Sequence, residues 1–303
     1  MFAHLWIPIT LIASSAQTAR NATQASLTAT LGPVGSAQVR FLYGLPFALI
    51  FLVVQLAFTH EPLPGIGGRT ALFALGGASA QILATILMLA AMQMKSFAVA
   101  TATTKTEPVL VALFGVAVLG DHLELAAWAA ILVATAGVVV MSLRPAKGRQ
   151  RVFDRGGATA IGLGVLSGAC FALAAIGFRG AILAMPAASF YLRATLVLAF
   201  GLGMQTTMLV AYLGLFDRPA LTRSFSVWRV SLGAGFFGAL ASQFWFLGFA
   251  LTSAANVRTL ALVEVLMAQL VQGRVFAQRA TRRDLIGMAL IVIGAGALIL
   301  AGG

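Results

Sequence analysis

Charged residues are scarce in this sequence. They make up 9% of its 303 residues, whereas hydrophobic residues make up 60%. Soluble globular proteins carry roughly 25% charged residues, which help to cover their water-facing surface. The shortage excludes an ordinary soluble domain, because lipid instead of water must contact most of the exterior. We therefore predict an all-α integral membrane protein with several membrane crossings, and we expect it in a bacterial inner membrane.

Cysteine and histidine are also rare, with one Cys and three His. The single Cys170 excludes an intrachain disulfide, and His4, His60 and His122 lie too far apart in sequence to suggest a metal site. We expect neither a metal nor a cofactor. The eight acidic residues lie mostly between apolar runs and form no carboxylate metal cluster or nucleophile–base pair, so we expect no enzymatic activity.

Basic residues outnumber acidic ones by 20 to 8, which gives a net charge of +12. A strongly basic chain can indicate nucleic-acid binding. Here the basic residues occupy short gaps between apolar runs, as they do in the loops of membrane proteins. The pattern favours a lipid bilayer as partner and no nucleic acid.

Ten segments have the roughly 20 mostly apolar residues that a membrane-crossing helix needs. They are residues 4–26, 36–58, 69–92, 97–119, 125–143, 158–179, 187–214, 229–251, 255–275 and 284–302. Turn-forming and charged residues fill the gaps, which we interpret as loops, FDRPALTR (216–223) among them.

The two halves of the chain resemble each other. TKTEPVLVALFGVAVLGDHLE (104–124) aligns without a gap with ALVEVLMAQLVQGRVFAQRAT (261–281), and this register matches Glu107 with Glu264. A carboxylate is rare inside an apolar segment, so the match carries more weight than the shared hydropathy. The alignment predicts an internal repeat.

Five helices in each half would have a geometric consequence. An odd number places the start of the second half, residues 151–303, on the opposite side of the membrane from the start of the first, residues 1–150. The halves are then inverted repeats, which typically create a substrate site near the membrane midplane. Extending the alignment also matches Gly137 with Gly294. We predict two five-helix repeats around a central cavity.

The segment TEPVLVALFGVAVLGDHL (106–123) and the helix that follows resemble the EamA repeat of the drug/metabolite transporter superfamily. The residues that match the Glu-Pro-Val start and the Leu-Gly-acidic turn of that repeat are Glu107, Pro108, Val109, Leu119, Gly120 and Asp121. The second half keeps Glu264, but Val265 replaces the proline and Ala277-Gln278 replace the Gly-acidic turn. The resemblance implies a ten-helix basket that exports metabolites or drugs.

Four ionisable residues lie within or near the ends of apolar segments: Lys105, Glu107, Arg258 and Glu264. A charge at mid-bilayer costs about 2.5–3.5 kcal/mol, so these side chains should face the bundle interior. Their spacings of two and six residues do not suit pairing along one helix face. We predict ion pairs between helices, which either line the substrate cavity or simply hold the two halves together.

The first helix has one polar stripe on an otherwise apolar surface. Its members are Ser14, Gln17, Arg20, Asn21 and Gln24. Such a stripe must be buried against protein or face water, because lipid offers no hydrogen bonds. It therefore forms either a cavity wall or hydrogen bonds between helices. Further candidates for the same wall are Gln81, Thr85, Ser242 and Gln243.

Two arginines, Arg40 and Arg193, occupy matched positions near the starts of the second and seventh segments. They either extend to the membrane interface or bind a substrate carboxylate. Trp245 lies deep in the eighth segment and either stacks on a substrate or packs against other helices.

The orientation of the chain is open at this stage. Most basic residues fall in loops after odd-numbered segments, so the positive-inside rule places both termini outside. The family resemblance implies that both termini are inside.

These patterns predict a secondary transporter that works by alternating access. We expect it to export a small polar or amphipathic metabolite, amino-acid-like or drug-like, with protons as a candidate coupling ion. The alternative is a facilitative channel or a structural membrane subunit. The sequence does not define the oligomeric state.

Overall fold

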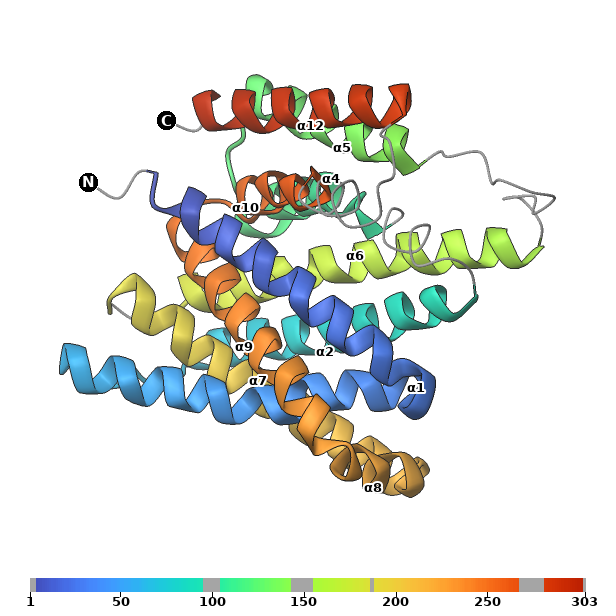
Figure 1. The fold of residues 1–303 in the computed structure, drawn as a ribbon. Helices are drawn as coiled ribbons and strands as arrows, with labels where there is room; N and C mark the ends of the chain where they lie inside the picture. Colours follow the sequence, from blue (N-terminus) through green and yellow to red (C-terminus); the bar gives the residue numbers. More distant parts are fainter. Residues whose placement is uncertain (1–3, 95–103, 143–154, 186–187, 267–280, 302–303) are drawn as a thin grey trace.

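The computed structural model describes residues 4–94, 104–142, 155–185, 188–266 and 281–301, and these residues form an all-α bundle (Figure 1). The helices are α1 (Trp6–Thr59), α2 (Gly68–Met94), α4 (Glu107–Phe114), the π-helix η1 (Gly115–Leu119), α5 (Leu125–Ser142), α6 (Arg155–Leu183), α7 (Phe190–Phe216), α8 (Arg218–Ser226), α9 (Trp228–Leu251), α10 (Ala254–Leu260), the 3₁₀-helix η2 (Ala261–Val263) and α12 (Arg282–Ala301). The first part of the predicted span 97–119 and the last part of 255–275 lie outside the described residues.

The distribution of polarity is that of a membrane protein. Six of the described helical segments are long and apolar enough to cross a bilayer, and Glu107–Leu119 and Leu125–Met141 are shorter apolar helices. Large apolar side chains cover the exterior, since Phe58, Leu125 and Leu300 are more than 80% exposed. Polar side chains are buried inside instead, which is the arrangement that lipid imposes.

Helix α1 consists of two arms that meet at a sharp break. Gly32 has φ 68° and ψ 177°, a backbone conformation that glycine adopts readily and other residues rarely. Pro33 follows and cannot donate a backbone hydrogen bond to the preceding turn. The two predicted spans 4–26 and 36–58 are therefore separate, but their helices extend up to the break.

The prediction of a loop at 216–223 is wrong, because α8 begins at Arg218. The Asp217 side chain caps this helix by accepting a hydrogen bond from the backbone N–H of Ala220 at 3.1 Å. Pro219 lies in the first turn, where its missing N–H costs nothing. An N-cap aspartate followed by proline is a helix-start signal that the polar composition of this segment obscured.

Helix contacts between the two halves occur in matched sets. Both arms of α1 pack on α9, because Gly235 lies against Tyr43 of the second arm and Gly248 near Thr10 of the first. Helix α6, which begins the second half, packs on α2. The last helices of the two halves, α5 and α12, pack on each other and lie side by side in Figure 1. Helix α4 likewise contacts α10.

Matched glycines allow α5 and α12 to approach closely. A Cβ atom added to Gly137 would lie 2.6 Å from the carbonyl oxygen of Gly287, and one added to Gly294 would lie 2.6 Å from the backbone nitrogen of Ala134. These distances leave no room for a side chain. Small residues at helix contacts are typical of membrane bundles, where close packing replaces the hydrophobic effect.

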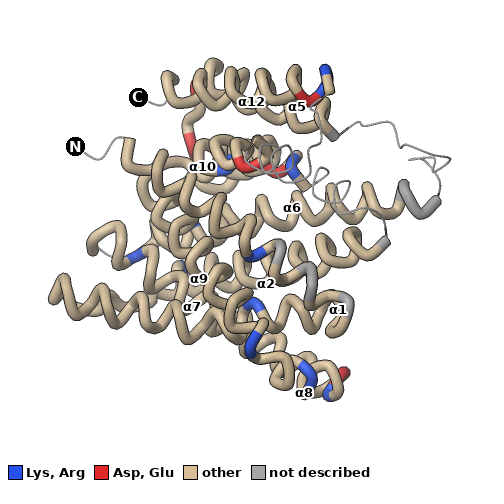
Figure 2. Tube along the Cα trace, viewed as in Figure 1, with Lys and Arg blue, Asp and Glu red and all other residues tan. Residues whose placement is uncertain are grey.

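The two ends of the bundle differ in charge. Helix α1 begins and α12 ends on the same side of the molecule (Figure 1). Lys and Arg positions gather on α8, at the opposite end (Figure 2). Arg218 and Arg223 lie on α8, and Arg282 and Arg283 begin α12. The described residues thus have the charge asymmetry that the sequence predicts, with basic groups away from the termini.

We predict that Gly294→Ala lowers the melting temperature of the detergent-solubilised protein. The new methyl group would collide with backbone atoms of α5, and overpacking of this kind costs about 1–3 kcal/mol. Gly296→Ala is the matched control, because a Cβ atom there meets nothing within 4 Å. An equal effect of the two substitutions in a thermal unfolding assay would contradict this account of the α5–α12 contact.

Candidate substrate cavity

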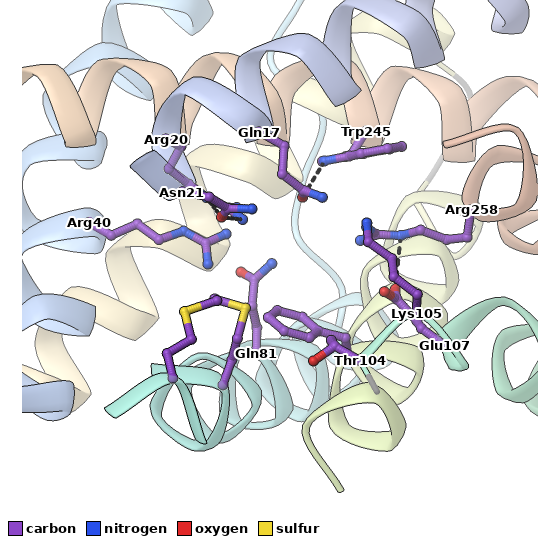
Figure 3. Close-up of a pocket in the computed structure, with 13 residues that line it drawn as sticks. Gln17, Arg20, Asn21, Arg40, Gln81, Thr104, Lys105, Glu107, Trp245 and Arg258 are labelled. Atoms are coloured by element: carbon purple, nitrogen blue, oxygen red, sulfur yellow. Dashed lines mark hydrogen bonds and ion pairs between the residues drawn. The ribbon is translucent and has the colours of Figure 1, made fainter. Parts of the chain in front are cut away.

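A cavity lies between helices of the two halves (Figure 3). Its lining residues are Gln17, Arg20, Asn21, Arg40, Gln81, Met88, Met92, Thr104, Lys105, Glu107, Phe171, Trp245 and Arg258. The space amounts to about 520 Å³, part of it open to solvent, but only about 40 Å³ is wide enough for the centre of a water-sized sphere. This conformation holds water or a very small solute, and a metabolite requires the helices to separate.

The cavity is placed at mid-depth in the bundle. Gln17 lies near the middle of the first arm of α1, Gln81 near the middle of α2 and Phe171 near the middle of α6. Three helix midpoints meet at one cavity, which therefore lies far from both ends of the bundle.

Two ion pairs cross between the halves at this depth. Lys105 pairs with Glu264, and Arg258 Nε lies 3.1 Å from Glu107 Oε1. The second contact is close enough for an ion pair, although its N–H direction is not aligned as a hydrogen bond. All four side chains are at least 88% buried. Each carboxylate is thus neutralised by a base from the other half, which matches the predicted pairing between helices.

Trp245 and Gln17 connect the two ion pairs. The Arg258 guanidinium carbon lies 4.4 Å from the centroid of the Trp245 ring, a cation–π distance. The Trp245 indole N–H donates to Gln17 Oε1 at 3.2 Å, and the Gln17 amide donates to Glu264 Oε2 at 3.4 Å. A continuous chain of contacts therefore joins the two ion pairs.

Arg20 and Arg40 line the other end of the cavity. Arg20 donates two hydrogen bonds to the Asn21 amide oxygen, at 2.7 and 3.2 Å. Arg40 donates to Thr85 Oγ1 at 3.0 Å. Both side chains are almost completely buried, with 3% and 2% exposure. Their hydrogen-bond partners are neutral groups.

The two glutamates lie on irregular helices. Glu107 begins α4, which has Pro108 in its first turn and continues into the π-helix η1. Glu264 directly follows the 3₁₀-helix η2, which interrupts the helix that α10 begins. Interrupted helices are a typical feature of transporter binding sites.

Polar contacts also tie helices together on the side of the termini. Arg179 Nη1 lies 2.6 and 2.7 Å from the Asp121 carboxylate oxygens, and Arg179 Nε donates to the Thr252 carbonyl at 3.1 Å. Nearby in the fold, Glu61 accepts hydrogen bonds from the Tyr191 hydroxyl at 2.7 Å and from the Ser189 backbone at 3.2 Å. The hydrogen bond from Tyr191 lowers the pKa of Glu61 most, and the hydrogen bond from the Ser189 backbone lowers it further. These contacts join Asp121 and Glu61, which lie between helices of the first half, to residues of the second half.

The cavity contains most of the residues that the sequence suggested for it. These are Gln17, Arg20, Asn21, Gln81, Lys105, Glu107, Trp245, Arg258 and Arg40. Glu264 lies at the edge, bonded to two lining residues.

Three suggested residues lie elsewhere. Gln24 donates to the Ser36 carbonyl at 2.9 Å and Gln243 to Thr195 Oγ1 at 2.7 Å, so both join helices to each other. Arg193 is not among the lining residues, although Arg40, its counterpart in the sequence alignment, is.

The sequence interpretation missed Met88, Met92, Thr104 and Phe171. Gln81, Thr85, Met88 and Met92 follow steps of three and four residues, so helical periodicity places both methionines on the polar face already noted. Nothing in the sequence distinguishes Phe171 from other apolar residues. Among the residues that the structure describes, no three His, Cys, Asp or Glu side chains come close enough together to hold a metal ion.

The fold and the mid-depth cavity define a multi-pass helical membrane protein. One solved crystal structure matches this fold with a TM-score of 0.71, over 98% of this chain and 96% of that chain, at 17% sequence identity. In total, 29 solved chains match in structure. At this identity the likeness shows the fold alone. No curated protein matches the sequence.

The sequence comparison identifies a family for the first half of the chain. Residues 4–143 match the EamA-like transporter family, so this stretch is an EamA-like transporter domain. The match covers the stretch from α1 to α5, which includes Glu107 and the Leu-Gly-acidic turn. The family resemblance noted in the sequence is confirmed.

We predict that Glu264→Gln destabilises the protein strongly, because it leaves the Lys105 ammonium buried without its counter-ion. Removal of one partner of a buried pair costs about 3–5 kcal/mol. The double variant Lys105→Met/Glu264→Gln should recover much of this loss, since neither charge remains. Thermal unfolding in detergent measures both variants, with the exposed Glu124→Gln as control. Simple additivity of the two single substitutions would show that the pair does not interact.

Proposed function

We propose that the protein is a secondary transporter that carries its substrate through the mid-depth cavity by alternating access. The two halves, residues 1–150 and 151–303, act as inverted five-helix repeats that complete ten membrane crossings around the cavity. The observation that carries the proposal is the pair of ion pairs between the halves, Lys105–Glu264 and Arg258–Glu107, which bound a buried polar cavity.

Two further features support the proposal. Matched helix contacts, such as α1 with α9 and α2 with α6, are the arrangement that a two-fold axis in the membrane plane would produce. The two helices that carry the glutamates both depart from regular α-helical geometry, α4 in the π-helix η1 after Glu107 and α10 in the 3₁₀-helix η2 before Glu264. A structural subunit would not need a buried charged cavity.

The substrate of this transporter is a small polar or amphipathic metabolite, amino-acid-like or drug-like, and the direction is export. Amides, charged groups and an indole ring line the cavity, and together they bind polar groups and flat apolar groups. The membrane is a bacterial inner membrane. The positive-inside rule, applied to the basic end at α8, places both termini outside.

Protons drive the transport through the two glutamates. Protonation of Glu107 or Glu264 removes the negative charge that holds a base of the other half. The halves can then separate on one side of the membrane while the proton is bound. This links proton binding to the movement that opens the cavity, as a coupled transporter requires.

In a panel of labelled small molecules, we expect uptake of the substrate into proteoliposomes to saturate as its concentration rises. We also expect this uptake to accelerate when the vesicles are preloaded with unlabelled substrate. Exchange of this kind requires a carrier that moves between two states. Flux that rises linearly with concentration and shows no exchange would favour a facilitative channel. A complete lack of flux for every solute would favour a structural subunit.

For coupling, we predict that Glu107→Gln or Glu264→Gln abolishes transport driven by a pH gradient. Glutamine keeps the shape of the side chain but cannot carry a proton. Uptake is measured with and without an imposed pH gradient, and Glu124→Gln, an exposed carboxylate away from the cavity, should behave as wild type. Unchanged gradient-driven uptake in both cavity variants would remove protons as the coupling ion.

A further inference from the structure

The cavity contains more positive than negative charge. Four basic side chains line it, and two of them, Lys105 and Arg258, are neutralised by the glutamates. Among the described residues, no carboxylate lies within ion-pair distance of Arg20 or Arg40. Two guanidinium groups therefore remain buried at mid-depth without a counter-ion.

The structure also brings these two arginines together. A Cβ atom added to Gly238 of α9 would lie 3.3 Å from Arg40 Cγ and 3.7 Å from Arg20 Cδ, so both stems cross the same glycine. Figure 3 shows both guanidinium groups at the same end of the cavity, near the Gln81 amide. Arg20 comes from the first arm of α1 and Arg40 from the second, and the break at Gly32 folds the arms back on each other.

Two adjacent buried guanidinium groups are costly unless an anion joins them. Arginine does not escape the cost by releasing its proton, because guanidinium is a very weak acid and stays charged in proteins. Like charges repel more strongly in a medium of low polarity. A carboxylate or phosphate between the two groups would remove the repulsion and accept paired hydrogen bonds from both.

Apolar side chains line the cavity beside this polar end. Met88 and Met92 lie one helical turn apart on the same face of α2 as Gln81, and Phe171 joins them from α6. Methionine is flexible and adapts to ligands of irregular shape, and its sulfur packs well against aromatic rings. The wall suits the apolar part of a small molecule whose charged end lies at the arginines.

We propose that the substrate is a small organic anion, with its oxyanion group bound between Arg20 and Arg40 and its apolar part against Met88, Met92 and Phe171. The inference rests on the proposed transport function and narrows its substrate class. Gly238 contributes as well, because a side chain there would crowd the Arg40 stem, and its absence leaves room for both arginines.

The test is a thermal-shift titration of the purified protein in detergent with matched probes. Phenylacetate and phenyl phosphate are the aromatic anions. Phenylacetamide is the neutral analogue of phenylacetate, and phenethylamine is the corresponding cation. Inorganic phosphate tests the oxyanion without an apolar part. We expect the aromatic anions to raise the melting temperature. Comparison of phenylacetate with phenyl phosphate shows whether a carboxylate or a phosphate fits better. The amide and the amine should have no effect.

Arg20→Gln and Arg40→Gln should each weaken the apparent affinity for the aromatic anion by about tenfold or more, the loss expected for a charge-assisted hydrogen bond. Arg223→Gln, on the exposed surface of α8, is the matched control and should keep the wild-type affinity. If either cavity variant does not fold, the comparison of phenylacetate with phenylacetamide on the wild-type protein still decides the question.

Stabilisation by the amide or the amine equal to that by the anion would overturn the inference, and so would the absence of any shift with all three anions. Proteoliposome flux separates this failure from failure of the transport proposal. Saturable exchange of a neutral or cationic solute would reject the anion while leaving the transporter intact. An absence of exchange for every solute would reject the transport function itself.

Discussion

The high cost of exposing charge to lipid is the constraint on which the rest of this structure depends. It drives Lys105, Glu107, Arg258 and Glu264 into the bundle, where each forms an ion pair with a residue of the opposite half. Helices that present these charges cannot pack as tightly as apolar ones, so a cavity remains between them. The same constraint leaves the outer surface to leucine, valine, isoleucine and phenylalanine. One physical cost thus sets the exterior, the pairing of the halves and the position of the cavity.

The contacts within the bundle divide into rigid and changeable ones. Glycines hold α5 against α12 through direct backbone contact, which side chains cannot easily rearrange. The ion pairs in the cavity, and Asp121–Arg179 at the side of the termini, join different helices through side chains alone. Side-chain contacts of this kind can break and re-form as helices tilt. In the proposed alternating access, the α5–α12 contact would stay fixed and the side-chain contacts around the cavity would exchange.

Much of the fold was predictable because hydropathy reflects the bilayer directly. Segment lengths, the polar stripe on the first helix and the inward-facing charges all follow from that one rule. The α8 helix was missed because its polar composition hid the Asp217 cap and Pro219. Arg40 and Arg193 match in sequence, yet only Arg40 reaches the cavity. A matched position in the alignment of the two halves does not determine side-chain environment, since the partners of each residue differ. Phe171 has no sequence signal, because its role depends on packing between helices that are distant in the chain.

Cysteine accessibility tests the central claim, that one cavity opens alternately to the two sides, most directly. In a variant with Cys170 replaced by serine, Gln81→Cys reports on the cavity, and an impermeant thiol reagent is applied to either side of sealed vesicles. A second form carries cysteines at 121 and 179 joined by a short cross-linker, which fixes the contact on the side of the termini. The account predicts labelling from both sides without the cross-link and only from the side opposite the termini with it. Two results would contradict alternating access. One is labelling from the side of the termini that persists in the cross-linked form, and the other is an absence of labelling from that side in both forms.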